Sequence, residues 1–261
     1  MCGVRQWGCE KTGSRQRKQE RIRALTEAPG ARVLLLQEVC SGDLSAARKR
    51  LGESWHSTFE PYVSVSANGS RSEVRCAESE QGTAGFAILS AWPLTSISHV
   101  VSAQPSAGLR RGILCATVAA ERVRVCNAHL SPPGSDRAHP TWELRDDQLK
   151  ALVRAASGQR TVFGGDLNTA PPGVAGNSGA WVWPSSLYTS YRECDQSGSS
   201  RAGRYTHQSG YKIDYLFTAL PRSGCTVLPS GASDHWALAM QVVTGQSPVS
   251  TSGRSTGRPG R

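Results

Sequence analysis

The stretch TVFGGDLN, residues 161–168, joins an apolar run to a carboxylate and an amide. Thr161–Gly164 predicts a strand, and Asp166 and Asn168 follow where that strand ends. Polar residues mark the ends of four other predicted strands: Gln37 and Glu38 after 33–36, His129 after 125–128, Asp214 before 215–218, and Asp234 and His235 before 236–243. Because strand-end loops hold functional groups on a rigid scaffold, this recurrence predicts one site built from several strands.

Strands outnumber helices along the rest of the chain. Helices are expected at Ser14–Ala28, Asp43–Leu51 and Trp142–Ala156, and strands at Arg32–Leu36, Gly85–Ser90, Ile113–Val118, Val123–Ala128, Thr161–Gly164, Ile213–Thr218 and Trp236–Val243. Residues 66–82 and 171–186 predict loops. This order predicts an α/β sandwich, two sheets with helices outside. Residues 1–244 are expected to form one domain, and the low-complexity residues 245–261 a disordered basic tail.

The composition argues against a membrane-spanning protein and favours an anionic partner. No apolar run approaches the roughly 18 residues of a transmembrane helix. Thirty Lys and Arg against 20 Asp and Glu give a net charge of +10, which suits nucleic acid, phosphorylated small molecules or anionic lipid surfaces. Much of the excess lies in residues 11–24 and in the tail, so the charge does not choose among these partners.

The eight cysteines lie outside any CxxC motif or zinc-like Cys/His spacing. A set of disulfides in an exported protein is the interpretation that we favour. Cys115 and Cys126 lie on two neighbouring predicted strands and form the most plausible bridge, because adjacent antiparallel strands bring Cα atoms to about 5.5 Å. The alternative is a cytoplasmic protein whose free thiols act as small apolar groups.

The strand ends supply hard oxygen donors, namely Glu38, Asp166, Asn168 and Asp234. Such donors suit Mg²⁺ or Mn²⁺, which take carboxylates and leave room for water and phosphate. His129 and His235 suit acid–base work or stabilisation of charge on a phosphate. Asp214 could hold one imidazole in the correct tautomer. The residue types therefore predict metal-assisted chemistry on a phosphate ester.

Five motifs follow one another over residues 33–243: LLLQEV (34–39), NAHL (127–130), GGDLN (164–168), KIDYLF (212–217) and SDHWAL (233–238). Together they resemble the endonuclease/exonuclease/phosphatase superfamily, which includes deoxyribonuclease I, abasic-site endonucleases, sphingomyelinases and inositol-polyphosphate 5-phosphatases. The resemblance implies a four-layer α/β/β/α sandwich of two mixed β-sheets flanked by helices. It also implies a divalent-metal-dependent hydrolase of phosphodiester or phosphomonoester bonds.

The resemblance implies roles at the metal and at the nucleophile. Glu38 is similar to the family's metal-binding glutamate. Asp166 and Asn168 resemble the pair that contacts metal, nucleophile and scissile phosphate. Asp234 resembles a further metal or second-site ligand. We therefore expect a magnesium or manganese site that includes these four residues.

The remaining roles that the resemblance implies concern the base and the phosphate. His235 resembles the general base toward the attacking water, and Asp214 resembles the residue that orients it. His129 and Arg111 resemble phosphate-contacting residues, with Arg110 as the alternative to Arg111. The other histidines match no catalytic motif: His56, His99, His139 and His207.

The chain departs from the resemblance at its start. The family's first strand carries an asparagine that contacts the metal–phosphate centre, whereas this sequence has no asparagine before Asn68. In similar exported bacterial members that strand runs into Asn-x-Cys-Gly, and Met1-Cys2-Gly3 would follow directly. We expect a start upstream of Met1, with a signal peptide, rather than a protein that lacks a core strand and a catalytic residue.

The substrate class stays open at this stage. The charge favours a nuclease-type phosphodiesterase that acts as a monomer on nucleic acid. Trp181 and Trp183, in the 171–186 loop, suit a sphingomyelinase-like enzyme that reaches lipid, and a phosphatase-like enzyme on a small phosphate ester is a further alternative. The last alternative is a non-catalytic nucleic-acid-binding relic without the first-strand asparagine.

Overall fold

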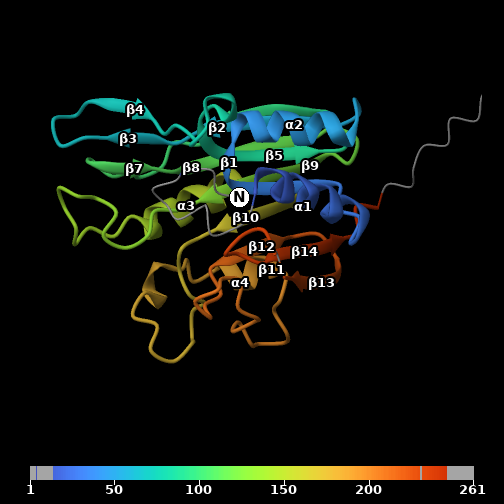
Figure 1. Ribbon diagram of the computed structural model, residues 1–261. Helices are drawn as coiled ribbons and strands as arrows, with labels where there is room; N and C mark the ends of the chain where they lie inside the picture. Colours follow the sequence, from blue (N-terminus) through green and yellow to red (C-terminus); the bar gives the residue numbers. More distant parts are fainter. Residues whose placement is uncertain (1–3, 5–13, 230, 246–261) are drawn as a thin grey trace, which may run out of the picture.

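Two β-sheets pack face to face at the centre of the molecule, and helices cover their outer faces (Figure 1). The computed structural model describes residues 4, 14–229 and 231–245. Its helices are α1 (Arg15–Glu27), α2 (Ser41–Leu51), α3 (Arg145–Ala155) and α4 (Leu187–Ser190), with 3₁₀ turns η3 (Ser79–Gln81) and η4 (Ala180–Val182). These layers confirm the predicted four-layer α/β/β/α sandwich.

The first sheet has the order β1-β5-β2 and is antiparallel. Its strands are β1 (Val33–Cys40), β2 (His56–Pro61) and β5 (Ala84–Ser90). Every residue of β5 is buried, because alternate side chains face two different layers. Phe86 and Ile88 pack toward the second sheet, whereas Ala87 and Leu89 pack against α1 and α2.

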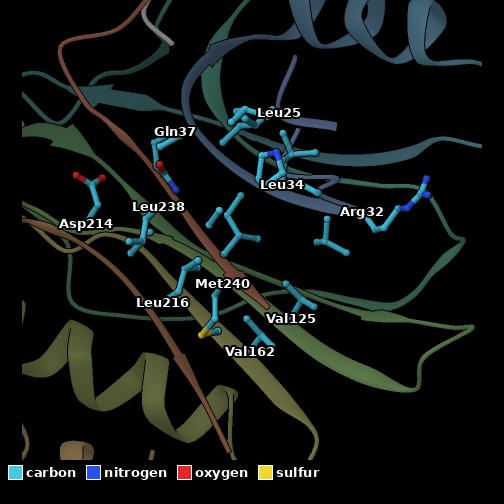
Figure 2. Close-up of a pocket in the computed structure, with 18 of the residues that line it drawn as sticks. Leu25, Arg32, Leu34, Gln37, Val125, Val162, Asp214, Leu216, Leu238 and Met240 are labelled. Atoms are coloured by element: carbon cyan, nitrogen blue, oxygen red, sulfur yellow. The ribbon is translucent and has the colours of Figure 1, made fainter. Parts of the chain in front are cut away.

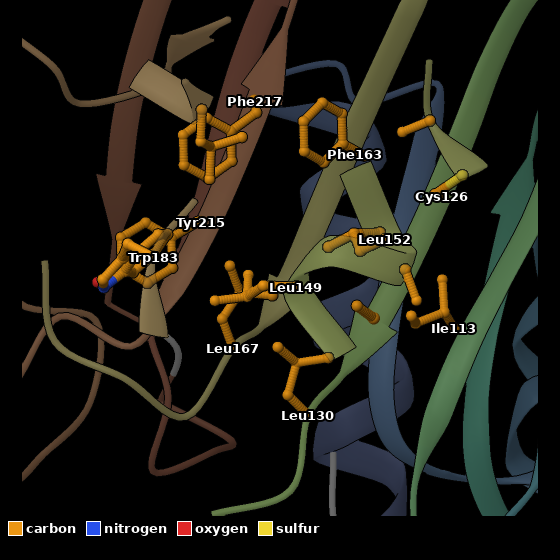
Figure 3. Close-up of a cluster of buried hydrophobic side chains, with 14 of the residues drawn as sticks. Ile113, Cys126, Leu130, Leu149, Leu152, Phe163, Leu167, Trp183, Tyr215 and Phe217 are labelled. Carbon is orange, nitrogen blue, oxygen red and sulfur yellow. The ribbon is translucent and has the colours of Figure 1, made fainter. Parts of the chain in front are cut away.

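The second sheet has the order β11-β12-β10-β9-β8-β6. Its strands are β6 (Leu94–His99), β8 (Gly112–Val118), β9 (Val123–His129), β10 (Thr161–Asp166), β11 (Arg192–Glu193) and β12 (Asp214–Thr218). It is mixed, since β9 and β10 run parallel and the other pairs are antiparallel. Phe163 and Phe217 lie in the same buried cluster as Leu149 and Leu152 of α3 (Figure 3), and Trp183 and Tyr188 pack on Phe217.

Two small sheets extend the sandwich. β13 (Arg222–Leu228) pairs with β14 (Ala237–Val242), and β3 (Val63–Val65) lies between β4 (Arg71–Glu73) and β7 (Gly108–Arg110). The two-stranded sheet lies beside β12. It therefore brings the segment that precedes β14 to the end of the large sheet.

The predicted helices and central strands are confirmed within a few residues, and two expectations need correction. Residues 66–82, expected to be a loop, contain β4 and η3. The first predicted strand, Arg32–Leu36, continues as β1 to Cys40. A β-bulge between Leu36 and Val39 allows polar Gln37 and Glu38 to lie inside the strand.

Three disulfides link the described cysteines: Cys40–Cys76, Cys115–Cys126 and Cys194–Cys225. The expected Cys115–Cys126 bridge is confirmed, with the two residues directly opposite in β8 and β9. Cys2 and Cys9 lie outside the described residues, as does nearly all of the expected tail. None of the described helices has the length and apolar character needed to cross a bilayer.

Candidate active site

One register row across the large sheet carries three of the expected site residues. Asp166 in β10 lies opposite His129 in β9 and opposite Asp214 in β12. A second register row consists of Cys126, Phe163 and Phe217, whose side chains face α3. Along each strand, the site residue lies three positions from the residue of this second row. Because side chains alternate along a strand, the three site residues point to the opposite face, toward the first sheet. Sequence positions 129, 166 and 214 are thereby brought together.

Gly164 and Gly165 allow β10 to lie close to both neighbours. A Cβ on Gly165 would lie 2.0 Å from the Ala128 carbonyl oxygen, and one on Gly164 would lie 1.8 Å from the Tyr215 carbonyl oxygen. Gly165 also has φ of +125°, which L side chains rarely adopt. The glycine pair before Asp166 therefore fixes where that carboxylate emerges.

Glu38 enters the site from the first sheet, at the bulge in β1. Its φ of +55° lies in the left-handed region, which is costly for a glutamate and is typical of functional positions. No hydrogen bond or ion pair joins its carboxylate to another residue of the described ranges. Its backbone N–H donates to Tyr62 Oη at 3.1 Å, so the strand geometry is held while the carboxylate is left available.

His129 is buried and contacts three polar groups. Arg111 Nε donates to its Nε2 at 3.0 Å, and Tyr62 Oη lies 2.5 Å from its Nδ1. Asp166 Oδ2 lies 3.3 Å from Nε2. Burial, with Arg111 as the next cause, lowers the pKa of His129, so it is neutral at physiological pH. Arg110 instead donates to the Pro105 carbonyl, which leaves Arg111 as the arginine at the site.

His235 is held by a chain of hydrogen bonds that ends in the backbone. Its Nδ1 lies 2.8 Å from Asp214 Oδ2, which also accepts from Thr206 Oγ1 at 2.7 Å. Burial lowers the pKa of His235, but the carboxylates of Asp214, Asp166 and Asp234 outweigh it and raise the pKa to about 9. Asp214 thus orients the ring and stabilises its cation, as a base–carboxylate pair requires.

Asp166 and Asn168 form a turn that aims their side chains. Asp166 Oδ1 accepts from the Asn168 backbone N–H at 2.9 Å, and Asn168 Nδ2 donates to the Leu130 carbonyl at 2.9 Å. Burial raises the pKa of Asp166, but His129, His235 and the Asn168 N–H lower it below its ordinary value overall. Because Asn168 Nδ2 is hydrogen-bonded to the Leu130 carbonyl, the side-chain amide oxygen of Asn168 is the atom that can bind a cation.

Asp234 lies beside His207 rather than in the register row. Its Oδ2 is 3.7 Å from His207 Nε2, and His207 packs edge-on against His235 with ring centroids 4.7 Å apart. His207 lies in none of the motifs, so its position could not be predicted from the sequence. Only the pairing of the 206–211 turn with the residues before β14 places it there.

Two polar residues of the motifs LLLQEV and NAHL, to which the resemblance assigned no role, connect the two sheets. Asn127 Nδ2 donates to the carbonyls of Leu36 and Ala87, and Gln37 Nε2 donates to Asn127 Oδ1 at 2.5 Å. These bonds connect β9 with β1 and β5 next to the site. In the sequence, Gln37 and Asn127 are marked by their places in these motifs and by their polarity within otherwise apolar strands.

An apolar groove of about 520 Å³ extends from the site between β1 and β14 (Figure 2). Leu34, Val125, Val162, Leu216 and Met240 contribute to its walls, and Glu38, Asp166, Asp214 and His235 line its polar part. Among the described strands, β1 pairs only with β5 and β14 only with β13. Each therefore has one backbone edge without a strand partner.

The sequence pattern of the Endonuclease/Exonuclease/phosphatase family matches residues 7–235. The chain belongs to the endonuclease/exonuclease/phosphatase family. Enzymes of this family hydrolyse phosphoric esters and generally use divalent metal ions. No curated protein matches the sequence.

Solved structures of the family share the fold. An endonuclease/exonuclease/phosphatase family protein from Leptotrichia buccalis has a TM-score of 0.62 and 14% identity, covering 88% of this chain and 93% of that one. The 3′ phosphatase NExo from Neisseria, bound to a product DNA hairpin, has a TM-score of 0.61 and 15% identity. The match covers 87% of this chain and 94% of NExo. An AP endonuclease from Archaeoglobus fulgidus has a TM-score of 0.58 and 16% identity. The match covers 88% of this chain and 95% of the endonuclease.

Proposed function

We propose that this chain is a divalent-metal-dependent phosphodiesterase that cleaves nucleic acid, with His235 as its general base. The observation that supports this proposal best is the Thr206–Asp214–His235 chain beside Asp166 in a groove. Asp214 engages Nδ1 of His235, so Nε2 is the nitrogen available to take a proton from water. Attack of that water on phosphorus needs no covalent intermediate with the protein.

The oxygen donors fit Mg²⁺ or Mn²⁺. Glu38 offers a carboxylate without a protein partner among the described residues, Asp166 a buried carboxylate, and Asn168 an amide oxygen. A bound divalent cation would neutralise charge that develops on the phosphate and on the leaving oxygen. Asp234 is proposed as a further ligand, and its side chain lies beside His207.

Arg111 and His129 are proposed to contact the scissile phosphate. The Arg111 guanidinium lies against His129, and its other N–H groups remain available to donate to phosphate oxygens. Tyr62 fixes the orientation of the His129 ring. Donors that are positioned before the reaction stabilise charge on the phosphate without a cost of reorganisation.

Nucleic acid is the substrate that we propose, acted on by a monomer. The net charge of +10 supports it, as does the fold shared with the 3′ phosphatase NExo from Neisseria, which binds a product DNA hairpin. The lipid alternative loses support because Trp183 is buried, donates its Nε1–H to the Ala170 carbonyl and packs on Tyr215. Trp181 alone of the two tryptophans is exposed.

Export is proposed from the cysteines. Three disulfides among the described residues suit an oxidising compartment.

The test of the function is hydrolysis of plasmid DNA and of bis(4-nitrophenyl) phosphate with Mg²⁺ or EDTA. We expect activity that EDTA abolishes. Glu38→Gln should require much more Mg²⁺ for half-maximal activity, with a smaller change in substrate KM, because one cation ligand loses its charge. Glu60→Gln is a matched control, since Glu60 pairs with His99. An unchanged magnesium titration with full activity in Glu38→Gln would remove Glu38 from the site.

A further inference from the structure

Two histidines and a carboxylate converge at one side of the proposed site. One potential ligand atom from each of His207, Asp234 and His235 lies within 4.8 Å of the others. All three residues are partly buried, so an ion from solvent can reach them. Of the two histidines, only His235 has a role in the proposed hydrolysis, in which its unprotonated nitrogen accepts a proton from water. The presence of His207 beside it is unexplained by that reaction.

Backbone hydrogen bonds fix the spacing of the three residues. His207 and His235 form a β-bridge. Gln208 N donates to the Asp234 carbonyl at 2.9 Å, and Trp236 N donates to the Thr206 carbonyl at 2.7 Å. The turn that carries His207 is therefore joined to the segment that carries Asp234 and His235. The donor atoms are brought together by the fold rather than by free rotation of surface side chains.

The available atoms suit a tetrahedral transition-metal ion. Asp214 engages Nδ1 of His235, and Ser209 Oγ lies 2.6 Å from Nδ1 of His207, so Nε2 of each ring can act as ligand. Histidine ligands in metal sites are commonly oriented by such bonds to the other ring nitrogen. His207 Nε2 and Asp234 Oδ2 are 3.7 Å apart, too far for a hydrogen bond and close to the roughly 3.3 Å between two tetrahedral zinc ligands.

We propose that His207, Asp234 and His235 form an inhibitory Zn²⁺ site. Two imidazoles and one carboxylate match the preference of zinc, with water as a fourth ligand. Mg²⁺ prefers the all-oxygen set around Glu38 and Asp166, and Asp234 is the residue that the two proposed sites share. The inhibition rests on the proposed function, because zinc on His235 Nε2 takes the same lone pair that removes the proton from water. Zinc binding itself does not depend on hydrolysis.

The first test is zinc binding to metal-stripped protein without Mg²⁺, measured by calorimetry with ZnCl₂. We expect the wild type to bind zinc at this cluster, in addition to any ion that the oxygen donors around Glu38 and Asp166 hold. His207→Ala should raise the Kd of the cluster at least about tenfold. His139→Ala is the matched control, because His139 is exposed and stacks on Trp142 away from the cluster. His207→Gln repeats the test with a longer side chain, and both variants must melt as the wild type does.

Side-chain NMR locates the bound ion. We expect ZnCl₂ to shift the imidazole nitrogens of His207 and His235 together, and to leave His139 unchanged. An equal Kd in wild type and both His207 variants, or shifts confined to other histidines, would overturn the site. Zinc should also inhibit the Mg²⁺-supported hydrolysis, at a concentration that His207→Ala raises by the same factor as the Kd.

The two proposals fail in different ways. If the protein hydrolyses no phosphodiester, the proposed function fails, while the calorimetry and NMR still decide the zinc site. If hydrolysis proceeds but zinc binds without inhibiting it, the inhibitory role is wrong. If zinc inhibits His207→Ala as it inhibits the wild type, zinc acts elsewhere, and the site proposed here is wrong.

Discussion

At the scale of single residues, side chains from distant parts of the chain orient the two histidines of the site. Asp214, Asp166 and His235 lie together, as their positions beside predicted strands led us to expect. Tyr62 and Thr206 orient His129 and His235, yet neither lies in a motif. Their roles arise from long-range contacts that no local spacing reports.

The pKa of His235 is the first residue-scale prediction. In the metal-free protein the neighbouring carboxylates raise it to about 9, against the opposing effect of burial. Since Asp214 stabilises the imidazolium, Asp214→Asn should lower the pKa toward 6.5, measured by NMR titration of the imidazole. Only the neutral ring is a base, so activity should fall as pH decreases through the pKa that applies with the cation bound. An unchanged pKa in Asp214→Asn would contradict the pairing.

Gly165 gives a stability prediction with an internal control. Gly165→Ala places a Cβ against the Ala128 carbonyl and retains a φ of +125°, so we expect it to lower the free energy of unfolding by at least about 2 kcal/mol. Gly158→Ala shares the positive φ, +129°, but its Cβ would meet no atom within 4 Å. Urea unfolding should therefore show a clearly smaller loss for Gly158→Ala, and equal losses would contradict the close approach of β9 and β10.

At the scale of elements, the strands buried on both faces were predictable, whereas the exposed edge strands β2 and β6 were not. The apolar runs of β5, β8 and β9 give a strong signal, because both of their faces meet apolar layers. β2 (HSTFEP) and β6 (LTSISH) lie at sheet edges, are largely unburied and show no clean alternation. The bulge in β1 could not be predicted either. Two polar residues after an apolar run, such as Gln37 and Glu38 here, are also typical of the end of a strand.

The disulfides give the prediction at this scale. Cys115–Cys126 joins adjacent strands, whereas Cys40–Cys76 and Cys194–Cys225 close longer loops of 36 and 31 residues. Protein matured in its native compartment, denatured without reductant, should show few thiols to a labelling reagent, and at least six more after reduction. Eight labelled thiols before reduction would contradict export and favour a reducing compartment.

At the scale of the whole molecule, the site exists because two sheets meet. The first sheet contributes Glu38, the second contributes His129, Asp166 and Asp214, and the segment before β14 contributes His235. Asn127 connects the sheets beside them. The order of the motifs predicted the fold, and the structure brings several of the predicted site residues together. The groove between β1 and β14, and the place of His207 against His235, required the three-dimensional structure.

Hydrolysis by His235→Ala tests the central claim most directly. The variant is compared with the wild type at saturating Mg²⁺ on plasmid DNA and on bis(4-nitrophenyl) phosphate, after matching melting curves confirm that it folds. We predict a loss of turnover on the order of 10²–10⁴ on both substrates with substrate binding retained, because the base is removed, and a smaller loss for Asp214→Asn, whose base is present but misoriented. Wild-type rates for His235→Ala on both substrates would contradict the mechanism.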